Sequence, residues 1–492
     1  HGINRNAGQA LTAACVYLAF FCTFRYGRPF LTSAAETFWL DLPLFALLWQ
    51  CRRSTTQNPA GAQSVEQNRA LANISIEYIA PVSIAFCILS GLVWGLGAAY
   101  KSFALIAPAA AALWCAVLVS QHHLSWRLVV QISLRLFGSA ILALGIFALW
   151  FVLDPDPAAV WNEFVVGENA GKMIDKQGYW HEALYGGDSS LWAQLLAYVQ
   201  NAGLLAFVVL GLAWLGIRLG IRNGASLRGQ PAHVYILLAW AAVWLVVFSI
   251  PSQRSARYVI PAMPAIAMLV ALYWDRIGRG WFLLSLALGA LAIVALSRIG
   301  WVAHDLNIAT GNELTLALSC AALGAAAFVA GLLKPQLTRA CAVAISIAVY
   351  ACFNAVVAPL DGPQGRYGAD ASARLSKARL AVPSDFNAQF ERFEFLLAGG
   401  NRFVPYDVAV TADPVAATAQ LTGYLQQFDA VIWAQGASTE TGPGCLPSCQ
   451  VLASRWIVKG RHKPGEINGA NLWYPHTWLF SREWLVVRAG PP

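Results

Sequence analysis

The stretch Trp161-Asn-Glu-Phe-Val-Val-Gly-Glu-Asn-Ala-Gly-Lys172 lies in a polar segment between two long apolar runs. From Leu153 to Ser190 this segment holds seven acidic residues against two lysines. If the neighbouring apolar runs cross a membrane, the positive-inside rule puts a loop so poor in basic residues on the non-cytoplasmic face. This assignment orients the rest of the chain.

The composition is that of a membrane protein. Of the 492 residues, 58% are hydrophobic and 12% are charged, which is far from the average of soluble domains. Largely uncharged runs of 16 to 24 residues recur through the first 360 positions. Such runs are long enough to cross about 30 Å of hydrocarbon. The net charge of +8 lies mostly in loops beside these runs, where it fixes topology, so no nucleic-acid partner is expected.

The apolar runs predict a polytopic α-helical membrane protein with about eleven spans. The predicted spans cover residues 9–24, 35–51, 79–99, 103–121, 131–152, 191–217, 233–250, 259–274, 280–297, 313–333 and 340–359. Gly91, Gly95 and Gly97 resemble a dinucleotide-binding signature, but a span and not a soluble strand precedes them. Close helix packing explains these glycines better.

A second domain is predicted after the last span. Alternation of the loops leaves residues 361–492 on the outer face, and charges there reach a soluble density. Strands are predicted over 378–382, 429–433 and 478–488, and helices over 386–397 and 415–427. The domains are therefore a membrane domain over 1–360 and a small extracytoplasmic α/β domain over 361–492. Trp473 and Tyr474 could stack on sugars, although core packing is the favoured interpretation.

Cys445 and Cys449 lie in a polar Gly/Pro-rich loop, unlike the other cysteines, which lie in or beside apolar runs. A local disulfide is favoured if this domain faces an oxidising compartment. A metal site is the alternative, but no second Cys or His pair at metal-ligand spacing accompanies the two cysteines. The chain begins with His1 and not Met, so a fragment or a processed product is expected.

Several outward-facing turns carry basic residues that the topology does not require. These residues are Arg25, Arg28, Lys101, Lys172, Arg254 and Arg257. Arginine and lysine at the headgroup level suit a phosphate, which arginine can bind in two places. The alternative for each residue is contact with lipid headgroups from a helix end. Convergence of these turns on one face favours a shared anionic ligand.

Two acidic residues fall within the second predicted span, Glu36 near its outer end and Asp41 deeper. An acidic residue inside a membrane is by default a functional-site hypothesis. The alternative is a buried hydrogen bond between helices.

Three motifs together resemble the C-type membrane glycosyltransferases, which use a polyprenyl-phosphate sugar as donor and include the aminoarabinose transferases of lipid A and the protein O-mannosyltransferases. The first is Trp161 to Lys172, similar to an aromatic-rich loop of that family, although Met173 replaces an aromatic residue. The second is Phe248-Ser-Ile-Pro-Ser-Gln-Arg-Ser-Ala-Arg257-Tyr258, followed by two prolines. The third is Gly97-Ala-Ala-Tyr-Lys101-Ser. The resemblance covers about residues 1–360.

The resemblance implies roles for the residues in these motifs. Glu168 and Asn169 would be the catalytic-site residues that orient the sugar or the acceptor. The donor phosphate would be bound by Lys101, Lys172, Arg254, Arg257 and Tyr258, with Arg25, Arg28, Glu36 and Glu163 as further candidates. Family members with His beside the glutamate can bind a divalent metal there. Asn169 is a poorer ligand, so no metal or other cofactor is assigned.

The resemblance also implies a reaction and a location. A sugar would pass from an undecaprenyl-type phosphate to a lipid, glycan or protein acceptor on the outer face of a bacterial inner membrane, with the C-terminal domain periplasmic. The first span here aligns with the third span of the aminoarabinose transferases, so two spans and an acidic catalytic loop would precede residue 1.

Two other classes of function compete with the transferase. A secondary transporter or lipid flippase is one alternative, although no internal repeat is evident and the unusual charges lie at the outer boundary instead of the midplane. A non-catalytic scaffold is the other, and it predicts that the basic turns are scattered in space.

Overall fold

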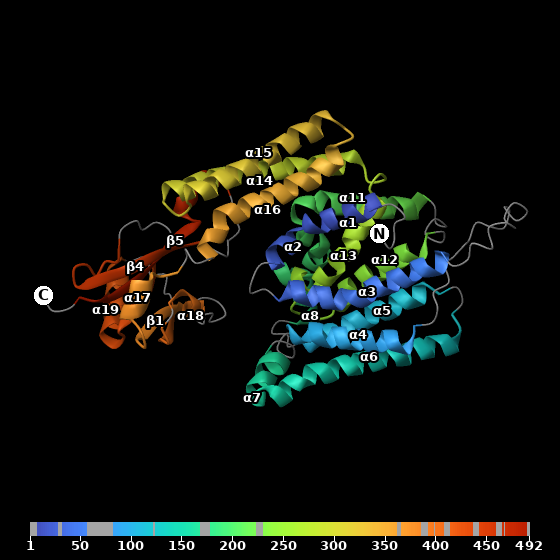
Figure 1. Cartoon of the computed structure of the whole chain (residues 1–492), viewed down its shortest axis with the longest axis horizontal. Coiled ribbons are helices and arrows are strands. Elements are labelled where there is room, and N and C mark those ends of the chain that lie inside the picture. Colours follow the sequence, from blue (N-terminus) through green and yellow to red (C-terminus); the bar gives the residue numbers. More distant parts are fainter. Residues whose placement is uncertain are drawn as a thin grey trace, which may run out of the picture. The chain divides into compact units, whose positions relative to one another are not determined.

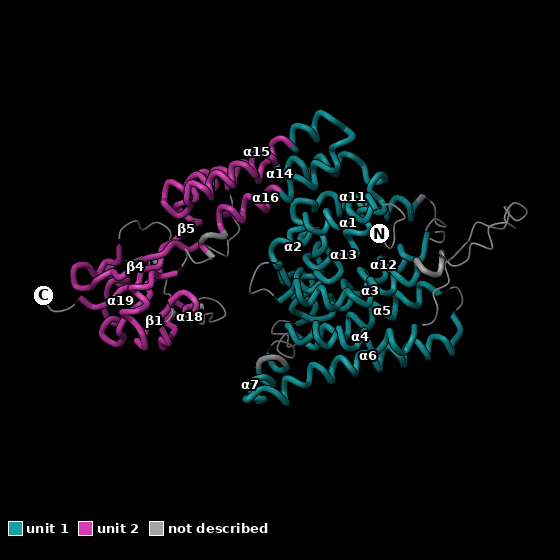
Figure 2. Tube along the Cα trace, in the orientation of Figure 1, with its two compact units in different colours: residues 1–289, 327–347 teal, residues 290–326, 348–492 magenta. Residues whose placement is uncertain are grey.

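The computed structural model describes residues 7–27, 32–56, 82–121, 124–167, 178–222, 230–361, 366–384, 392–397, 399–407, 414–435, 442–458, 465–466 and 468–489. Helices predominate up to residue 361, and a mixed sheet with helices follows (Figure 1). The chain divides into two compact units (Figure 2). The first unit comprises residues 1–289 and 327–347, and the second unit comprises residues 290–326 and 348–492.

The helices before residue 361 cover every predicted span. They are α1 (Ala7–Leu18), α2 (Phe21–Tyr26), α3 (Ser33–Thr56), α4 (Ile84–Ala99), α5 (Ile106–Val119), α6 (Trp126–Leu153), α7 (Pro157–Val160), η3 (Trp161–Gly167), α8 (Tyr179–Tyr185), α9 (Leu191–Leu195), α10 (Ala197–Ala202), α11 (Ala206–Arg222), α12 (Ala232–Val247), η8 (Ala256–Ala262), α13 (Met263–Leu272), α14 (Arg279–Asp305), α15 (Gly311–Leu333) and α16 (Thr338–Asp361).

Five helical stretches within the described residues are long and apolar enough to cross a membrane. They are Trp126–Leu153, Ala197–Ile221, Arg279–Asp305, Gly311–Leu333 and Thr338–Val357. Shorter apolar helices of 10–17 residues lie at several of the other predicted spans. The prediction of an integral, mostly helical membrane protein is confirmed. The count of eleven spans, the orientation and the domain boundary at residue 360 stay predictions.

Helix α4 packs closely against α6 through two glycines. A Cβ atom at Gly91 would lie 2.7 Å from the carbonyl oxygen of Ser139, and one at Gly95 would lie 2.6 Å from Cβ of Ile146. Neither distance is compatible with a side chain. Small residues permit this approach because dispersion contacts hold helices together in a membrane. The interpretation of these glycines as packing residues is confirmed.

The second unit contains a five-stranded sheet with the order β2-β1-β3-β5-β4. Its strands are β1 (Arg379–Ser384), β2 (Arg402–Asp407), β3 (Ala430–Gln435), β4 (Cys449–Val458) and β5 (Phe480–Arg488). Strand β1 is parallel to β2 and β3, whereas β5 is antiparallel to β3 and β4. The helices around it are α17 (Ala369–Arg374), α18 (Arg392–Leu396), α19 (Pro414–Gln427) and α20 (Gly469–Trp473).

Alternation along the strands builds one apolar core on each face of this sheet, since successive side chains point to opposite faces. Leu380 and Ile432 pack with Phe393, next to α18, on one face. Val431 and Trp433 pack on the other face with residues of α19. The predicted strands in the regions of β1, β3 and β5 and the predicted helix at α19 are confirmed, and β2 and β4 were not predicted.

The favoured core packing of Trp473 and Tyr474 is wrong. Their exposed fractions are 57% and 52%. Both residues follow one another at the end of the short helix α20, where the chain has not yet entered the sheet.

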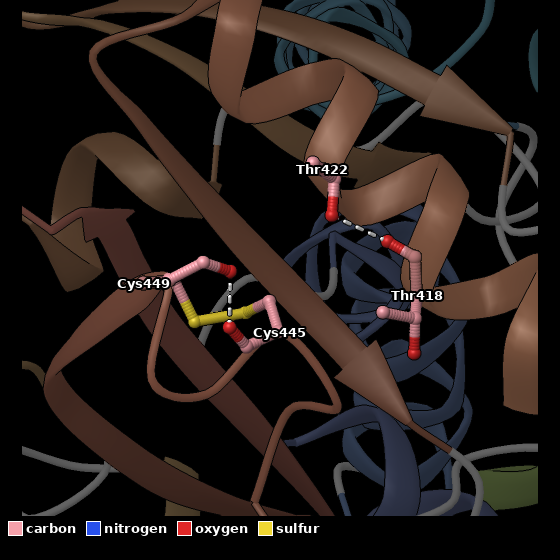
Figure 3. The surroundings of a disulfide bond; sticks show 5 residues. Thr418, Thr422, Cys445 and Cys449 are labelled. Carbon is pink, nitrogen blue, oxygen red and sulfur yellow. Dashed lines mark hydrogen bonds between the residues drawn. A yellow bond between two sulfur atoms is a disulfide. The ribbon is translucent and has the colours of Figure 1, made fainter.

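The predicted disulfide between Cys445 and Cys449 is present and packs beside α19 (Figure 3). Both cysteines are buried. A Cβ atom at Gly444 would lie 2.4 Å from the Thr418 hydroxyl of α19, so the loop lies directly on this helix. The disulfide loop is therefore part of the core on that face of the sheet.

Replacing Cys445 and Cys449 together with Ala is expected to destabilise the second unit by about 2 kcal/mol. The cross-link closes a short loop and so removes only modest entropy from the unfolded chain. Thermal unfolding of the double variant measures the loss, and Cys320→Ala, at a free cysteine of α15, is the control. An unchanged unfolding temperature in the double variant would show that the disulfide does not stabilise the unit.

Candidate functional site

Three segments distant in sequence bring charged side chains together in the first unit. Glu36 lies in the first turn of α3, and Lys101 follows the C-terminal end of α4. Arg257 and Tyr258 begin the 3-10 helix η8, which continues into α13. A carboxylate in the first turn of a helix is favoured by the helix dipole. We call Glu36, Lys101, Arg257 and Tyr258 the Glu36 cluster.

The Glu36 cluster is held by one ion pair and one aromatic ring. Lys101 Nζ lies 3.2 Å from Glu36 Oε2, with exposed fractions of 20% for the lysine and 1% for the glutamate side chain. The Tyr258 ring faces two cations, Lys101 Nζ at 5.8 Å and Arg257 Cζ at 5.5 Å from its centroid. Arg257 also acts electrostatically on Glu36. Two cations and one buried carboxylate therefore share a single location.

The two cations differ in what they can reach. Lys101 is half-buried and engaged with Glu36, whereas Arg257 is exposed. An exposed guanidinium beside an aromatic face retains its N–H groups for an anion, which it can bind in a bidentate manner. The predicted convergence of Lys101 and Arg257 is present in the structure, and their role in binding phosphate stays a prediction.

Arg254 lies in the turn before η8 but is occupied by backbone carbonyls. Its side chain donates to the carbonyl oxygens of Ser249 at 2.9 Å and Ser189 at 2.9 Å. The guanidinium lies 4.9 Å from the centre of the Tyr179 ring, and the Tyr179 hydroxyl donates to Ser249 as well. Arg254 is 4% exposed. The geometry is that of a residue that fixes the turn carrying Arg257.

Arg254→Met is expected to destabilise the first unit by about 2 kcal/mol, because buried carbonyls lose a charged donor. Thermal unfolding in detergent measures the change. Gln253→Ala, at an exposed position of the same turn, is the matched control. Normal unfolding with strongly reduced ligand binding would contradict the structural role and favour direct contact with a phosphate.

The remaining predicted residues are distributed as follows. Arg25 lies in α2, with its guanidinium 5.7 Å from the ring centres of both Phe21 and Tyr26. Glu163 belongs to the π-helix η3, and its side chain lies outside the described residues. The positions that complete the set also lie outside the described residues: Arg28, Glu168, Asn169 and Lys172. Within the described residues, no group of three or more His, Cys, Asp and Glu side chains could hold a metal ion.

A cavity of about 470 Å³ lies in the first unit among α1, α2, α3 and α13. Its lining is largely apolar and includes Phe38, Pro264 and Met268. Asp41, the deeper acidic residue of α3, also lines this cavity and is 1% exposed. Sequence reasoning noted Asp41 but not the cavity, because its walls come from helices that are distant along the chain.

Comparison with known proteins gives relatives of one kind. The chain is 22% identical over 314 residues to the undecaprenyl phosphate-alpha-4-amino-4-deoxy-L-arabinose arabinosyl transferase of Yersinia enterocolitica, covering 61% of this chain and 48% of that protein. For the protein of that name in Pectobacterium carotovorum, the identity is 23% over 325 residues, covering 65% and 47%. The chain thus spans about half the length of the curated relatives it matches. No protein-family profile matches it.

Among solved structures, ArnT from Cupriavidus metallidurans bound to undecaprenyl phosphate aligns with 98% of this chain and 84% of its own chain. The TM-score is 0.43 and the sequence identity is 17%.

Proposed function

The chain is a relative of the undecaprenyl phosphate-aminoarabinose arabinosyl transferases, which are C-type membrane glycosyltransferases, and on this premise we propose that it transfers a sugar from a polyprenyl-phosphate donor to an acceptor at the membrane boundary. The acceptor is a lipid, a glycan or a protein. The observation that carries the proposal is the meeting of Lys101 and Arg257 at Tyr258, beside Glu36.

The chemistry of the reaction needs cations at this place. The bond between the sugar and the phosphate oxygen breaks, a bond to the acceptor oxygen forms, and the acceptor hydroxyl loses its proton. The departing phosphate becomes more negative as the reaction proceeds. Positioned cations that interact most strongly with the developing charge lower the barrier. Arg257 would bind the phosphate oxygens and Lys101 would complete the charge, while Glu168 and Asn169 would orient the sugar or the acceptor.

Glu36 has a positioning role in this proposal. A lysine side chain is flexible, and the ion pair with a buried carboxylate holds its ammonium in one place. The donor phosphate would then share Lys101 with Glu36. The apolar cavity beside α3 and α13 is suited to part of the isoprenoid chain, because it is lined largely by hydrophobic side chains.

The proposal includes a location in the bacterial inner membrane with the sheet of the second unit on the periplasmic side. The disulfide supports this side, since disulfides persist in oxidising compartments such as the periplasm.

The direct test is a transfer assay with the purified full-length protein in lipid. A polyprenyl-phosphate sugar with a labelled sugar is offered with lipid A, a glycan or a peptide as acceptor. Transfer of label with release of polyprenyl phosphate is the expected result. Movement of the intact donor across a proteoliposome membrane without release of polyprenyl phosphate would contradict the transferase and favour a flippase.

A further inference from the structure

The second unit contains a cavity that the proposed transfer reaction does not use. Its volume is about 560 Å³, within the range of small-molecule sites. One wall is formed by the edge strand β4 and its neighbour β5, and the other by the turn between α14 and α15 together with the end of α16. Polar and charged side chains contribute much of the lining: Asp305, Asn307, Ser454, Arg455 and Arg482.

Arg482 is the most distinctive residue of this cavity. It lies directly opposite Trp456 in the antiparallel pairing of β5 with β4. Its Cζ atom lies 5.0 Å from the centre of the Trp456 ring and 4.7 Å from that of Trp484. Within the described residues, no carboxylate lies within ion-pair distance of Arg482, and its buried Nε has no hydrogen-bond partner. Two aromatic rings thus fix a guanidinium whose charge is not offset by an ion pair.

The second arginine of the cavity is neutralised. Arg455 Nε donates to Glu483 Oε2 at 2.6 Å, and exposed fractions are 8% for Arg455 and 1% for Glu483. Burial, followed by the nearby Glu483 charge, raises the pKa of the adjacent Tyr367 phenol well above its usual value, so Tyr367 adds no charge. The net attraction for an anion at this wall therefore comes from Arg482.

The opposite wall presents hydrogen-bonding groups from a well-defined turn. Asp305 is the last residue of α14, and Asn307 adopts a left-handed conformation with φ of 56°. Such a residue is typical of the turn that ends a helix. The amide of Ile308 donates to the carbonyl of Ala303 at 2.8 Å, which closes this turn. The side chains of Asp305 and Asn307 are thus placed by ordered backbone.

We propose that this cavity binds a phosphorylated sugar headgroup. The guanidinium of Arg482 matches a phosphate in a planar, bidentate geometry, and its fixed position reduces the entropy lost on binding. Asp305 accepts hydrogen bonds and donates none, so it favours hydroxyl groups and disfavours a bare anion. Asn307 and Ser454 can donate to or accept from further hydroxyls. A ligand that carries both a phosphate and neighbouring hydroxyls satisfies both walls.

Two sources supply this chemistry, the phosphorylated sugar of a glycolipid and the glycerol phosphate of an anionic phospholipid. The proposal is independent of the transferase activity, because it concerns binding to the second unit alone. It can be tested on the full chain in detergent by titration calorimetry with glucose 1-phosphate, inorganic phosphate and glucose. Glucose 1-phosphate is expected to bind at least tenfold more tightly than either of the other two probes.

Variants identify the site. Arg482→Gln is expected to weaken glucose 1-phosphate binding at least tenfold, whereas Arg488→Gln, at an exposed position of the same strand, leaves it unchanged. Asp305→Asn is expected to strengthen binding of inorganic phosphate while reducing the preference for the sugar phosphate over phosphate. If Arg482→Gln fails to fold, Arg482→Lys, which keeps the charge and loses the planar fork, is expected to weaken the sugar phosphate several-fold.

Equal affinity of the wild type and the Arg482 variants for glucose 1-phosphate would overturn the proposal. Equal binding of phosphate and glucose 1-phosphate would also overturn it, since it would indicate a simple anion site. Nanodiscs distinguish the two sources. If phosphatidylglycerol in place of phosphatidylcholine abolishes glucose 1-phosphate binding, the natural ligand is a phospholipid headgroup. If binding persists, it is a glycolipid sugar phosphate.

Discussion

Replacing Arg257 with Ala in the full-length protein is expected to lower the rate of sugar transfer by about 100-fold. Loss of one positioned donor to a developing negative charge typically costs a factor of about 100 to 1,000. Arg257 is exposed and lies against the Tyr258 ring, so its removal leaves no buried charge behind. Stability should therefore change little. The measurement is the initial rate of label transfer at saturating donor, together with thermal unfolding.

The controls for Arg257 separate charge from geometry. Arg257→Lys retains a cation but loses the bidentate fork, so an intermediate rate is expected. Gln253→Ala, in the same exposed turn, should transfer at the wild-type rate. Transfer by Arg257→Ala within a few-fold of the wild type would remove this residue from the site and leave the proposed mechanism without its exposed cation.

Lys101→Met is expected to reduce both stability and transfer. Glu36 is 1% exposed, and the substitution leaves its carboxylate buried without the ammonium 3.2 Å away. Breaking a buried ion pair from one side costs about 3 kcal/mol, because an uncompensated charge remains. Transfer should fall by at least 100-fold, since the leaving phosphate also loses a cation. Thermal unfolding and the transfer assay measure the two effects separately.

A double variant distinguishes the structural role of Lys101 from its role in the reaction. Glu36→Gln removes the buried charge, so Glu36→Gln with Lys101→Met should recover most of the lost stability. It should not recover transfer. Recovery of both in the double variant would mean that Lys101 serves only to neutralise Glu36. Glu36→Gln alone should retain more transfer than Lys101→Met, because the ammonium is still present.

Much of the fold could be predicted from local pattern. The apolar runs mark the helices because their length and composition are read within one segment. The strands in the regions of β1, β3 and β5 were predicted because each is a short apolar or alternating run. Strand β2 contains Pro405 and lies at a sheet edge, where proline is tolerated but the sequence signal is weak. Strand β4 has an irregularity between Val451 and Ala453, which interrupts its alternation.

The candidate site was only partly predictable for a different reason. Lys101, Arg257 and Glu36 could be found because charges at the ends of apolar helices are unusual. The contacts of Arg254 could not be found, since Ser189 is 65 positions away and contributes a backbone carbonyl, which carries no signal in the sequence. For the same reason the cavities depend on which helices and strands become neighbours.

The glycines of α4 bear on the position of Lys101. The lysine follows the end of this helix directly, and its backbone amide donates to the carbonyl of Ala98. A methyl group at Gly95 would meet Ile146 and separate α4 from α6 at mid-length. The resulting tilt would displace the ammonium, although the substituted position makes no contact with it. The spacing of two helices deep in the bundle thus sets the height at which a cation is offered to the membrane surface.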